Sequence, residues 1–480
     1  PKISLGNTAS LTQYGENLSP GTHEITIADE AKLDIYLQSG GDTIGDYSLF
    51  DNVRLVKVVS AASFYPPEFE LQNLEAVADP DVTEPAAKAT SIETPSYLDP
   101  VSGTKVFRAT IPSDFPSGTF VRHEYSRRQA FNCDNTRYIA QASNGFWLLY
   151  DANTFQVLPR GRANGALLGM AGDCEAFWDA TDPAKLIYTG NNGGLVYWEK
   201  DVETDTDTVA FDFTGRLPGG WSGTTAMWTK SEGTPSADGR YMAFMATSYN
   251  SGSQSNVIHG LVCYDRQTDT IVGTLDASAF SGNFPDHISM SPSGDFVVPS
   301  WAFTPALGTR VYNRDFSSYT IILDESEHSD LALNALGQDI LVAADYGQDN
   351  IIAYNLHTDE TWNIMGLYPR AGANIGAIHI SGKCFEQPGW VLISTYADSS
   401  DYTSTYPDSE LEPGQRALFL VELLPESFRM LFVCHTRAAE DYGGYFGEHQ
   451  ATISRDGTRA MFATNFNDGG VSSDYMVLLP

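Results

Sequence analysis

The chain has 480 residues, more than one small core needs, so its length favours two units or one large repeat fold. Its composition is globular, and its 42 glycines and 24 prolines favour many short strands joined by turns over long helices. The formal net charge of −33 excludes a protein that binds nucleic acid or anionic membranes, because such a surface repels polyanions at long range.

The cysteines and the start of the chain bear on where the protein acts. Five scattered cysteines form no CxxC pair and no disulfide framework, and no apolar run reaches the length of a membrane span. The chain starts at Pro1 and not at Met, which favours removal of a leader or of a larger N-terminal region. Salty water screens the self-repulsion of so acidic a protein. We expect a secreted or periplasmic protein, and a monomer.

The N-terminal part differs from the rest of the chain. Residues 1–60 alternate apolar and polar side chains like β-strands, as in 32–37 and 52–57, and residues 47–55 resemble the closing strands of a carbohydrate-binding jelly roll. We expect an N-terminal β-rich extension over 1–60. Residues 61–100 carry many prolines and predict a linker or a strap.

One pattern recurs seven times from residue 123 to the C-terminus. A polar residue enters a first strand, a turn rich in Ser, Asp, Asn and Gly follows, and a second apolar strand leaves the turn; residues 448–464 are the clearest copy. The copies begin at His123, Glu175, Glu232, His287, His328, His379 and His449. Intervals of 52, 57, 55, 41, 51 and 70 residues separate these anchors, which suits four-stranded blades with variable loops.

Further strands complete the pattern. A third strand follows each pair, as at 146–151 and 260–265, and a fourth follows in several copies, as at 319–323. The seventh copy stops after its third strand, and residues 105–109 can supply the missing outer strand and so close the ring. We therefore predict an all-β protein in which residues 101–480 form a seven-bladed β-propeller. Two unrelated β domains are the alternative.

The repeat also predicts where polar side chains gather. In a propeller, the loop that enters the innermost strand and the loop that leaves the second strand open on the same face. The entries carry His123, His287, His328, His379 and His449, and the exits include Asn144, Tyr188, Tyr249, Trp301 and Tyr346. We expect imidazoles, phenols and amides around a central funnel. The alternative is that these aromatic residues pack between blades.

A basic cluster stands out against the acidic background. Arg122, Arg127 and Arg128 lie within seven residues of one another, and guanidinium groups suit carboxylates and sulfates. Together with His287, Trp301 and Tyr346 they predict a binding site for an acidic polysaccharide. The alternative is a surface patch that pairs with the abundant acidic residues.

Four stretches carry a resemblance to known families. Residues 96–110 resemble the entry segment of oligogalacturonate lyases, and residues 123–134, 379–394 and 448–459 resemble propeller ulvan lyases. The likeness covers about residues 95–480. It implies β-elimination on a uronate polysaccharide: a group neutralises the carboxylate, a base removes the C5 proton and an acid protonates the departing O4.

The substrate that the resemblance implies is ulvan, a sulfated algal polysaccharide. Another uronan, such as pectic oligomers, is one alternative, and a non-catalytic glycan-binding propeller is another. No Gly-x-Ser-x-Gly elbow supports a hydrolase, and no Walker-type loop supports nucleotide use.

The resemblance also implies roles for single residues. His123 matches the first-blade histidine of ulvan lyases, and Tyr188 lies where a catalytic tyrosine is expected. Asn144 stands where a second histidine is expected, so the chain departs from that pattern. We predict Tyr188 as base or acid, His123 as its partner or as the carboxylate neutraliser, Asn144 as neutraliser and Tyr249 as a reserve phenol.

A metal is a separate prediction. His328, His379, His435 and His449 come from copies five to seven, and imidazole clusters suit zinc. Together with the resemblance they predict a structural divalent metal, zinc or calcium, and no organic cofactor. The alternative is that these histidines bind neighbouring backbone or carboxylates.

Overall fold

The computed structural model describes residues 2–7, 33–38, 82–116, 118–301, 304, 306–324, 328–368, 375, 377–396, 414–425, 429–438, 448–466 and 472–479. The chain divides into two compact units, Pro1–Lys57 and Val58–Pro480. In the first unit, β1 (Lys2–Asn7) pairs antiparallel with β2 (Leu33–Gln38). The predicted strand at 52–57 and the jelly-roll segment at 47–55 lie outside the described residues. The predicted boundaries at 60 and 100 stay predictions.

Within its described residues, the second unit contains five separate four-stranded antiparallel sheets, each made of four consecutive strands, which we number blades 2 to 6. Blade 2 contains β8 (Phe177–Trp178), β9 (Lys185–Tyr188), β10 (Val196–Asp201) and β11 (Thr206–Asp212). Blade 3 contains β12 (Ala226–Trp228), β13 (Tyr241–Asn250), β14 (Ser255–Asp265) and β15 (Thr270–Asp276). Blade 4 contains β16 (His287–Met290), β17 (Phe296–Trp301), β18 (Gly308–Asn313) and β19 (Tyr319–Leu323). Blade 5 contains β20 (Ser329–Leu333), β21 (Asp339–Asp345), β22 (Asn350–Asn355) and β23 (Thr361–Gly366). Blade 6 contains β24 (Ile378–Ser381), β25 (Trp390–Thr395), β26 (Ala417–Glu422) and β27 (Met430–His435).

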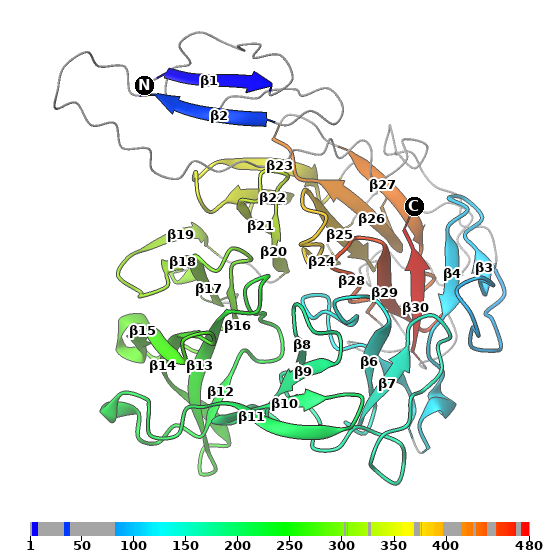
Figure 1. The fold of residues 1–480 in the computed structure, drawn as a ribbon, viewed down its shortest axis with the longest axis horizontal. Helices are drawn as coiled ribbons and strands as arrows, with labels where there is room; N and C mark the ends of the chain where they lie inside the picture. Colours follow the sequence, from blue (N-terminus) through cyan, green and yellow to red (C-terminus); the bar gives the residue numbers. More distant parts are fainter. Residues whose placement is uncertain are drawn as a thin grey trace. The chain divides into compact units, whose positions relative to one another are not determined.

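The remaining strands form one larger sheet that divides naturally in two. Blade 1 is β5 (Val121–Arg122), β6 (Arg137–Ala142) and β7 (Trp147–Asp151), and blade 7 is β28 (Thr452–Ile453), β29 (Arg459–Thr464) and β30 (Ser473–Leu478). A single parallel bridge, Ser473 to Val121, joins the two. Dividing the sheet there is consistent with seven blades, and Figure 1 shows the sheets following one another around a common centre.

The ring closes by the predicted strand exchange. β4 (Lys105–Arg108) pairs antiparallel with β30, with Met476 opposite Phe107, and the short β3 (Tyr97–Leu98) pairs with β4. Figure 1 shows β4, from before the first blade, beside the C-terminal β30. This confirms that residues upstream of blade 1 supply the outer strand of blade 7.

The repeated turns have one physical basis. In blade 7 the Ser454 hydroxyl accepts a hydrogen bond from the backbone N–H of Arg459 at 2.9 Å, and the Ser236 hydroxyl does the same for Tyr241 in blade 3. Gly457 closes the first of these turns with φ 71°, a left-handed conformation that glycine adopts without steric cost. The Ser-x-Asp-Gly pattern is therefore a hydrogen-bonded turn between the first two strands of a blade.

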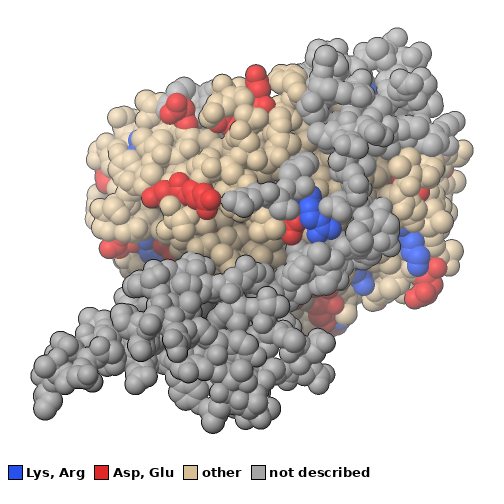
Figure 2. Space-filling model, turned by 90° about the horizontal axis from the view of Figure 1, so that it is seen from above, with Lys and Arg blue, Asp and Glu red and all other residues tan. Residues whose placement is uncertain are grey.

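Short 3-10 helices, Pro112–Asp114, Gly219–Trp221 and Ala277–Phe280, lie in the connections. Within the described residues, no helix is long and apolar enough to cross a membrane. On the face seen in Figure 2, Asp and Glu side chains occupy several separate places, and Lys or Arg lies beside some of them.

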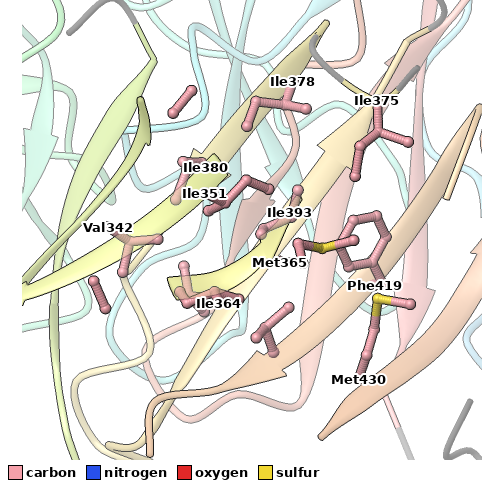
Figure 3. Close-up of a cluster of buried hydrophobic side chains, with 14 of the residues drawn as sticks. Val342, Ile351, Ile364, Met365, Ile375, Ile378, Ile380, Ile393, Phe419 and Met430 are labelled. Carbon is pink, nitrogen blue, oxygen red and sulfur yellow. The ribbon is translucent and has the colours of Figure 1, made fainter. Parts of the chain in front are cut away.

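The core lies between neighbouring blades. Figure 3 shows side chains of blade 5, including Val342 and Ile351, facing Ile380, Ile393 and Phe419 of blade 6. All five are fully or almost fully buried. Each fully buried aliphatic or aromatic side chain of this size contributes about 1.5–3 kcal/mol, so contacts between blades are a main source of stability.

Removal of the Phe107 ring tests the ring closure. Phe107 is fully buried and stacks on Phe155 with ring centroids 5.5 Å apart. We expect Phe107→Ala to lower the free energy of unfolding by about 3–5 kcal/mol, because it leaves a cavity where β4 closes the ring. Lys105→Ala, at an exposed position on the same strand, is the control and should change it little. Urea unfolding followed by tryptophan fluorescence measures both, and equal effects would contradict the closing role of β4.

Candidate functional site

The centre of the ring is filled by the segment that follows β5. Arg127 is only 2% exposed, and its guanidinium contacts three other blades. It donates hydrogen bonds to the Ser329 carbonyl of blade 5 and to the Glu232 carboxylate that follows β12 of blade 3, and Nη1 lies 3.1 Å from His287 Nδ1 of blade 4. A buried charge needs such partners, because an unpaired one is strongly destabilising.

Arg128 has a similar setting. It is 4% exposed, donates to the Gly233 carbonyl and pairs with Glu124 at 3.2 Å and with Glu175 at 3.5 Å. The third predicted arginine, Arg122, donates to the side chain of Gln450 in blade 7. The structure thus places the basic cluster inside the ring, where it pairs with internal acceptors. Its predicted contact with substrate stays a prediction.

Beside Arg127 lies a group that can bind a cation. One ligand atom each from Glu232, Asp286 and His287 lies within 4.8 Å of the other two. Lys230 Nζ lies 2.7 Å from Asp286 Oδ1. The side chains of Glu232, Asp286 and Lys230 are 22%, 20% and 39% exposed, so this end of the ring centre reaches solvent.

Sequence reasoning found part of this group. It selected His287 as a binding residue and used Glu232 as a repeat anchor, but it missed Asp286 and Lys230. The available signal was that Glu232 stands where most copies carry histidine, and that an acidic residue immediately precedes His287.

Two of the predicted metal ligands lie next to each other. The rings of His328 and His379 make an edge contact with centroids 4.9 Å apart, and His379 also stacks on Tyr396. In the described part of the chain, Nδ1 of each ring is buried without a hydrogen-bond partner. His379 Nε2 lies 3.4 Å from Glu448 Oε2, which is an ion-pair distance without hydrogen-bond geometry.

The other two predicted metal ligands bind elsewhere. His435 Nδ1 lies 2.9 Å from Asp99 Oδ2. Burial opposes ionisation of Asp99, but the hydrogen bonds and charge of His435 outweigh it and lower the pKa of Asp99 to about 2. His449 Nδ1 donates to the Ala463 carbonyl at 3.1 Å, so its Nε2 accepts from the Thr436 hydroxyl at 2.6 Å. The four histidines therefore do not share one set of partners.

The four predicted catalytic residues lie in different surroundings. His123 is buried, with Nδ1 2.8 Å from Asp474 Oδ1 and Nε2 2.6 Å from the Gln450 carbonyl, both in blade 7. Asn144 is exposed, and Tyr249 is 61% exposed at the end of β13. Within the described residues, no interaction joins these three side chains or Tyr188 to one another.

Tyr188 ends β9 and is 4% exposed. Burial raises its pKa well above the usual value, and the neighbouring Asp207 carboxylate, which accepts a hydrogen bond from the hydroxyl, raises it further. This setting disfavours the phenolate that a base would need.

The two remaining predicted binding residues differ in exposure: Trp301 is buried and donates to the Asn283 carbonyl at 2.9 Å, and Tyr346 is 36% exposed.

Comparisons with known proteins place the fold. No family model matches the chain, and no curated protein matches it. Among solved structures, an oligogalacturonate lyase from Vibrio parahaemolyticus is 15% identical, with a TM-score of 0.52 over 80% of this chain and 96% of that chain. An oligogalacturonate lyase in complex with manganese is 14% identical, with a TM-score of 0.52 over 80% of this chain and 95% of that chain. At these identities the likeness establishes that the chain shares their fold.

The buried histidines predict a pH-dependent stability. Burial, reinforced at His287 and His328 by the nearby Arg127 charge, lowers the pKa of His287, His328 and His449 to about 4, and that of His379 also lies well below its usual value. Because histidine in an unfolded chain titrates near about 6.5, the unfolded state takes up protons first as the pH falls. The stability that these neutral imidazoles contribute is fully present above about pH 6.5, and it is lost as the pH falls toward their pKa in the folded protein.

We therefore expect the four imidazoles to contribute roughly three to four protons to the uptake on unfolding near pH 5, and His328→Gln to lower the total uptake by about one. The slope of the urea-unfolding free energy against pH, compared between the wild type and His328→Gln, measures this difference. A flat profile between about pH 5 and 6.5 would contradict the buried neutral imidazoles.

Proposed function

We propose that this protein is a lyase that cleaves a uronate-containing polysaccharide by β-elimination, with pectic oligogalacturonate as the first candidate substrate. The observation that carries the proposal is the Glu232–Asp286–His287 group beside Arg127 and Lys230 at the ring centre. The fold shared with two oligogalacturonate lyases supports this substrate class.

The residues at the ring centre fit a divalent cation. Two carboxylates and one imidazole offer oxygen and nitrogen donors within 4.8 Å of one another, and carboxylate oxygens suit manganese. Lys230 holds one of these carboxylates now, and its 39% exposed side chain can turn into solvent. When bound there, a divalent cation would supply positive charge that neutralises the uronate carboxylate. The manganese complex of one structural neighbour supports this choice of metal.

The chain's own side chains supply the remaining chemistry. Lys230, once released from Asp286, binds the substrate carboxylate at the solvent-facing end of the group. Stabilising charge at that carboxylate makes the C5 proton more acidic. We assign the acceptance of this proton to His328, whose Nδ1 has no hydrogen-bond partner in the described part of the chain and whose ring is uncharged at neutral pH because burial lowers its pKa. As the proton leaves C5, the C4–C5 double bond forms, the C4–O4 bond breaks, and the departing O4 takes a proton from water.

Ulvan is the second candidate substrate. It is favoured by the likeness of residues 123–134 to the first blade of propeller ulvan lyases. A secreted or periplasmic location and a monomeric state belong to the same proposal.

A spectroscopic assay with matched variants tests the function. We expect ultraviolet absorbance from unsaturated uronyl ends to rise when the protein is mixed with oligogalacturonate. Lys230→Gln should raise KM about 10- to 150-fold, since one charged hydrogen bond is worth about 1.5–3 kcal/mol. Lys185→Gln, a lysine of blade 2 that pairs with Glu199 at the surface, is the matched control and should leave KM unchanged.

The other outcomes are also informative. A rise with ulvan alone selects the second candidate. No rise with pectate, ulvan, alginate or glycosaminoglycans would remove the lyase proposal and leave a glycan-binding propeller. If activity is lost in Tyr188→Phe but kept in His328→Gln, the base is Tyr188 of blade 2 and not His328.

Metal removal gives a separate prediction. Dialysis against a chelator should lower both the activity and the thermal midpoint, and added Mn²⁺ should restore both, because a ligand that binds only the folded state stabilises it. Differential scanning calorimetry and the absorbance assay measure the two effects. An unchanged midpoint and rate would exclude a metal at the ring centre.

A further inference from the structure

The turn that carries Lys230 and Glu232 has an unfavourable backbone conformation. Lys230 and Ser231 have φ angles of 68° and 59°, so two successive residues other than glycine are left-handed. Such conformations persist only where the surroundings fix them, and they gather at functional sites. The candidate site therefore depends on whatever holds this turn.

Glu175, which lies just before blade 2, binds the turn at two residues. This side chain is 2% exposed and precedes β8. Its Oε2 accepts hydrogen bonds from the Thr229 backbone N–H at 3.1 Å and from the Thr229 hydroxyl at 2.6 Å, and its Oε1 accepts from the Ser231 N–H at 2.6 Å. Hydrogen bonds to a carboxylate are stronger than neutral ones, so one side chain ties residues before and within the left-handed pair.

The far end of the turn is fixed as well. Arg128, the ion-pair partner of Glu175, donates to the Gly233 carbonyl, and the Gly233 N–H donates to the Thr229 hydroxyl at 3.0 Å. A Cβ at Gly233 would lie 1.8 Å from the Ile288 carbonyl oxygen, so the chain packs directly against blade 4 there. The turn has no room to relax toward its neighbour.

We propose that Glu175 is a positioning residue for the candidate site. It holds residues 229–233 in the conformation that places Lys230 beside Asp286 and Glu232 beside His287, and it acts through the turn, since its contacts are with Thr229, Ser231 and Arg128. This inference rests on the proposed function, which it deepens.

Glu175→Gln tests the inference, because an amide nitrogen cannot accept a hydrogen bond, so in either orientation the side chain loses its bond from the backbone N–H of Ser231 or of Thr229. We expect kcat/KM on trigalacturonate to fall at least tenfold and the affinity for Mn²⁺, measured by calorimetry, to fall about as much. Ser231→Gly alone should change little, because glycine adopts positive φ freely. In the double variant it should recover a large part of both losses, which a merely structural role of Glu175 does not predict.

Two further variants complete the design. Glu203→Gln, a carboxylate with a 47% exposed side chain that pairs with Arg137, is the matched control and should match the wild type. Thr229→Val removes the hydroxyl between Glu175 and Gly233 and keeps the side-chain shape, so it tests the same contact if Glu175→Gln does not fold. It should lower the Mn²⁺ affinity in the same direction.

The outcomes separate this inference from the proposed function. An active Glu175→Gln with unchanged Mn²⁺ affinity overturns the inference and leaves the function standing. If the wild type binds Mn²⁺ but has no lyase activity, and Glu175→Gln binds Mn²⁺ more weakly, the proposed function is overturned and the inference is kept. A wild type that neither cleaves these substrates nor binds Mn²⁺ overturns both.

Discussion

Arg127, buried at the ring centre, ties three blades together through one guanidinium group. Its charge is stable there only because blades 3, 4 and 5 each present a partner, namely Glu232, His287 and the Ser329 carbonyl. Breaking such a buried pair by removing one partner costs about 3–5 kcal/mol. The same contacts that hold the inner ends of these blades in place therefore also assemble the candidate site.

Under the proposed function, this arrangement allows an acidic protein to bind an acidic sugar. The net charge of −33 repels polyanions at a distance, and Figure 2 shows Asp and Glu at several places on one face. At the ring centre, however, Arg127 and Lys230 balance the charges of Glu232 and Asp286. Under the proposed function, a cation bound by this group and Lys230, once released from Asp286, would provide local attraction that the surface as a whole does not.

Much of the fold follows from the sequence, because a blade is a local pattern. The Ser-x-Asp-Gly turn is closed by hydrogen bonds within five residues, so it is visible in the sequence, as in Ser454 to Arg459. The exchange of β4 was predictable because the last copy lacked an outer strand, and the β30–β4 pairing confirms it.

The site was less predictable, because its contacts join distant parts of the chain. Arg127 and Arg128 were predicted to bind an acidic polysaccharide, with a surface patch as the alternative, yet Arg127 pairs with a residue 105 positions away, and no local pattern reveals such a partner. The predicted roles of His123 and Tyr188 came from resemblance, and their surroundings depend on Asp474 and Asp207, which no motif marked. Likewise, His435 binds Asp99 and His449 binds Thr436, and neither partner is part of the repeated sequence pattern.

A crystal structure of the protein with Mn²⁺ and trigalacturonate would show directly whether metal and sugar bind at the ring centre. If the ring centre is the functional site, anomalous scattering will place the metal between Glu232, Asp286 and His287, with a uronate carboxylate next to Lys230. A sugar bound instead beside Tyr188 and Asn144, with no metal peak at the ring centre, would contradict the account.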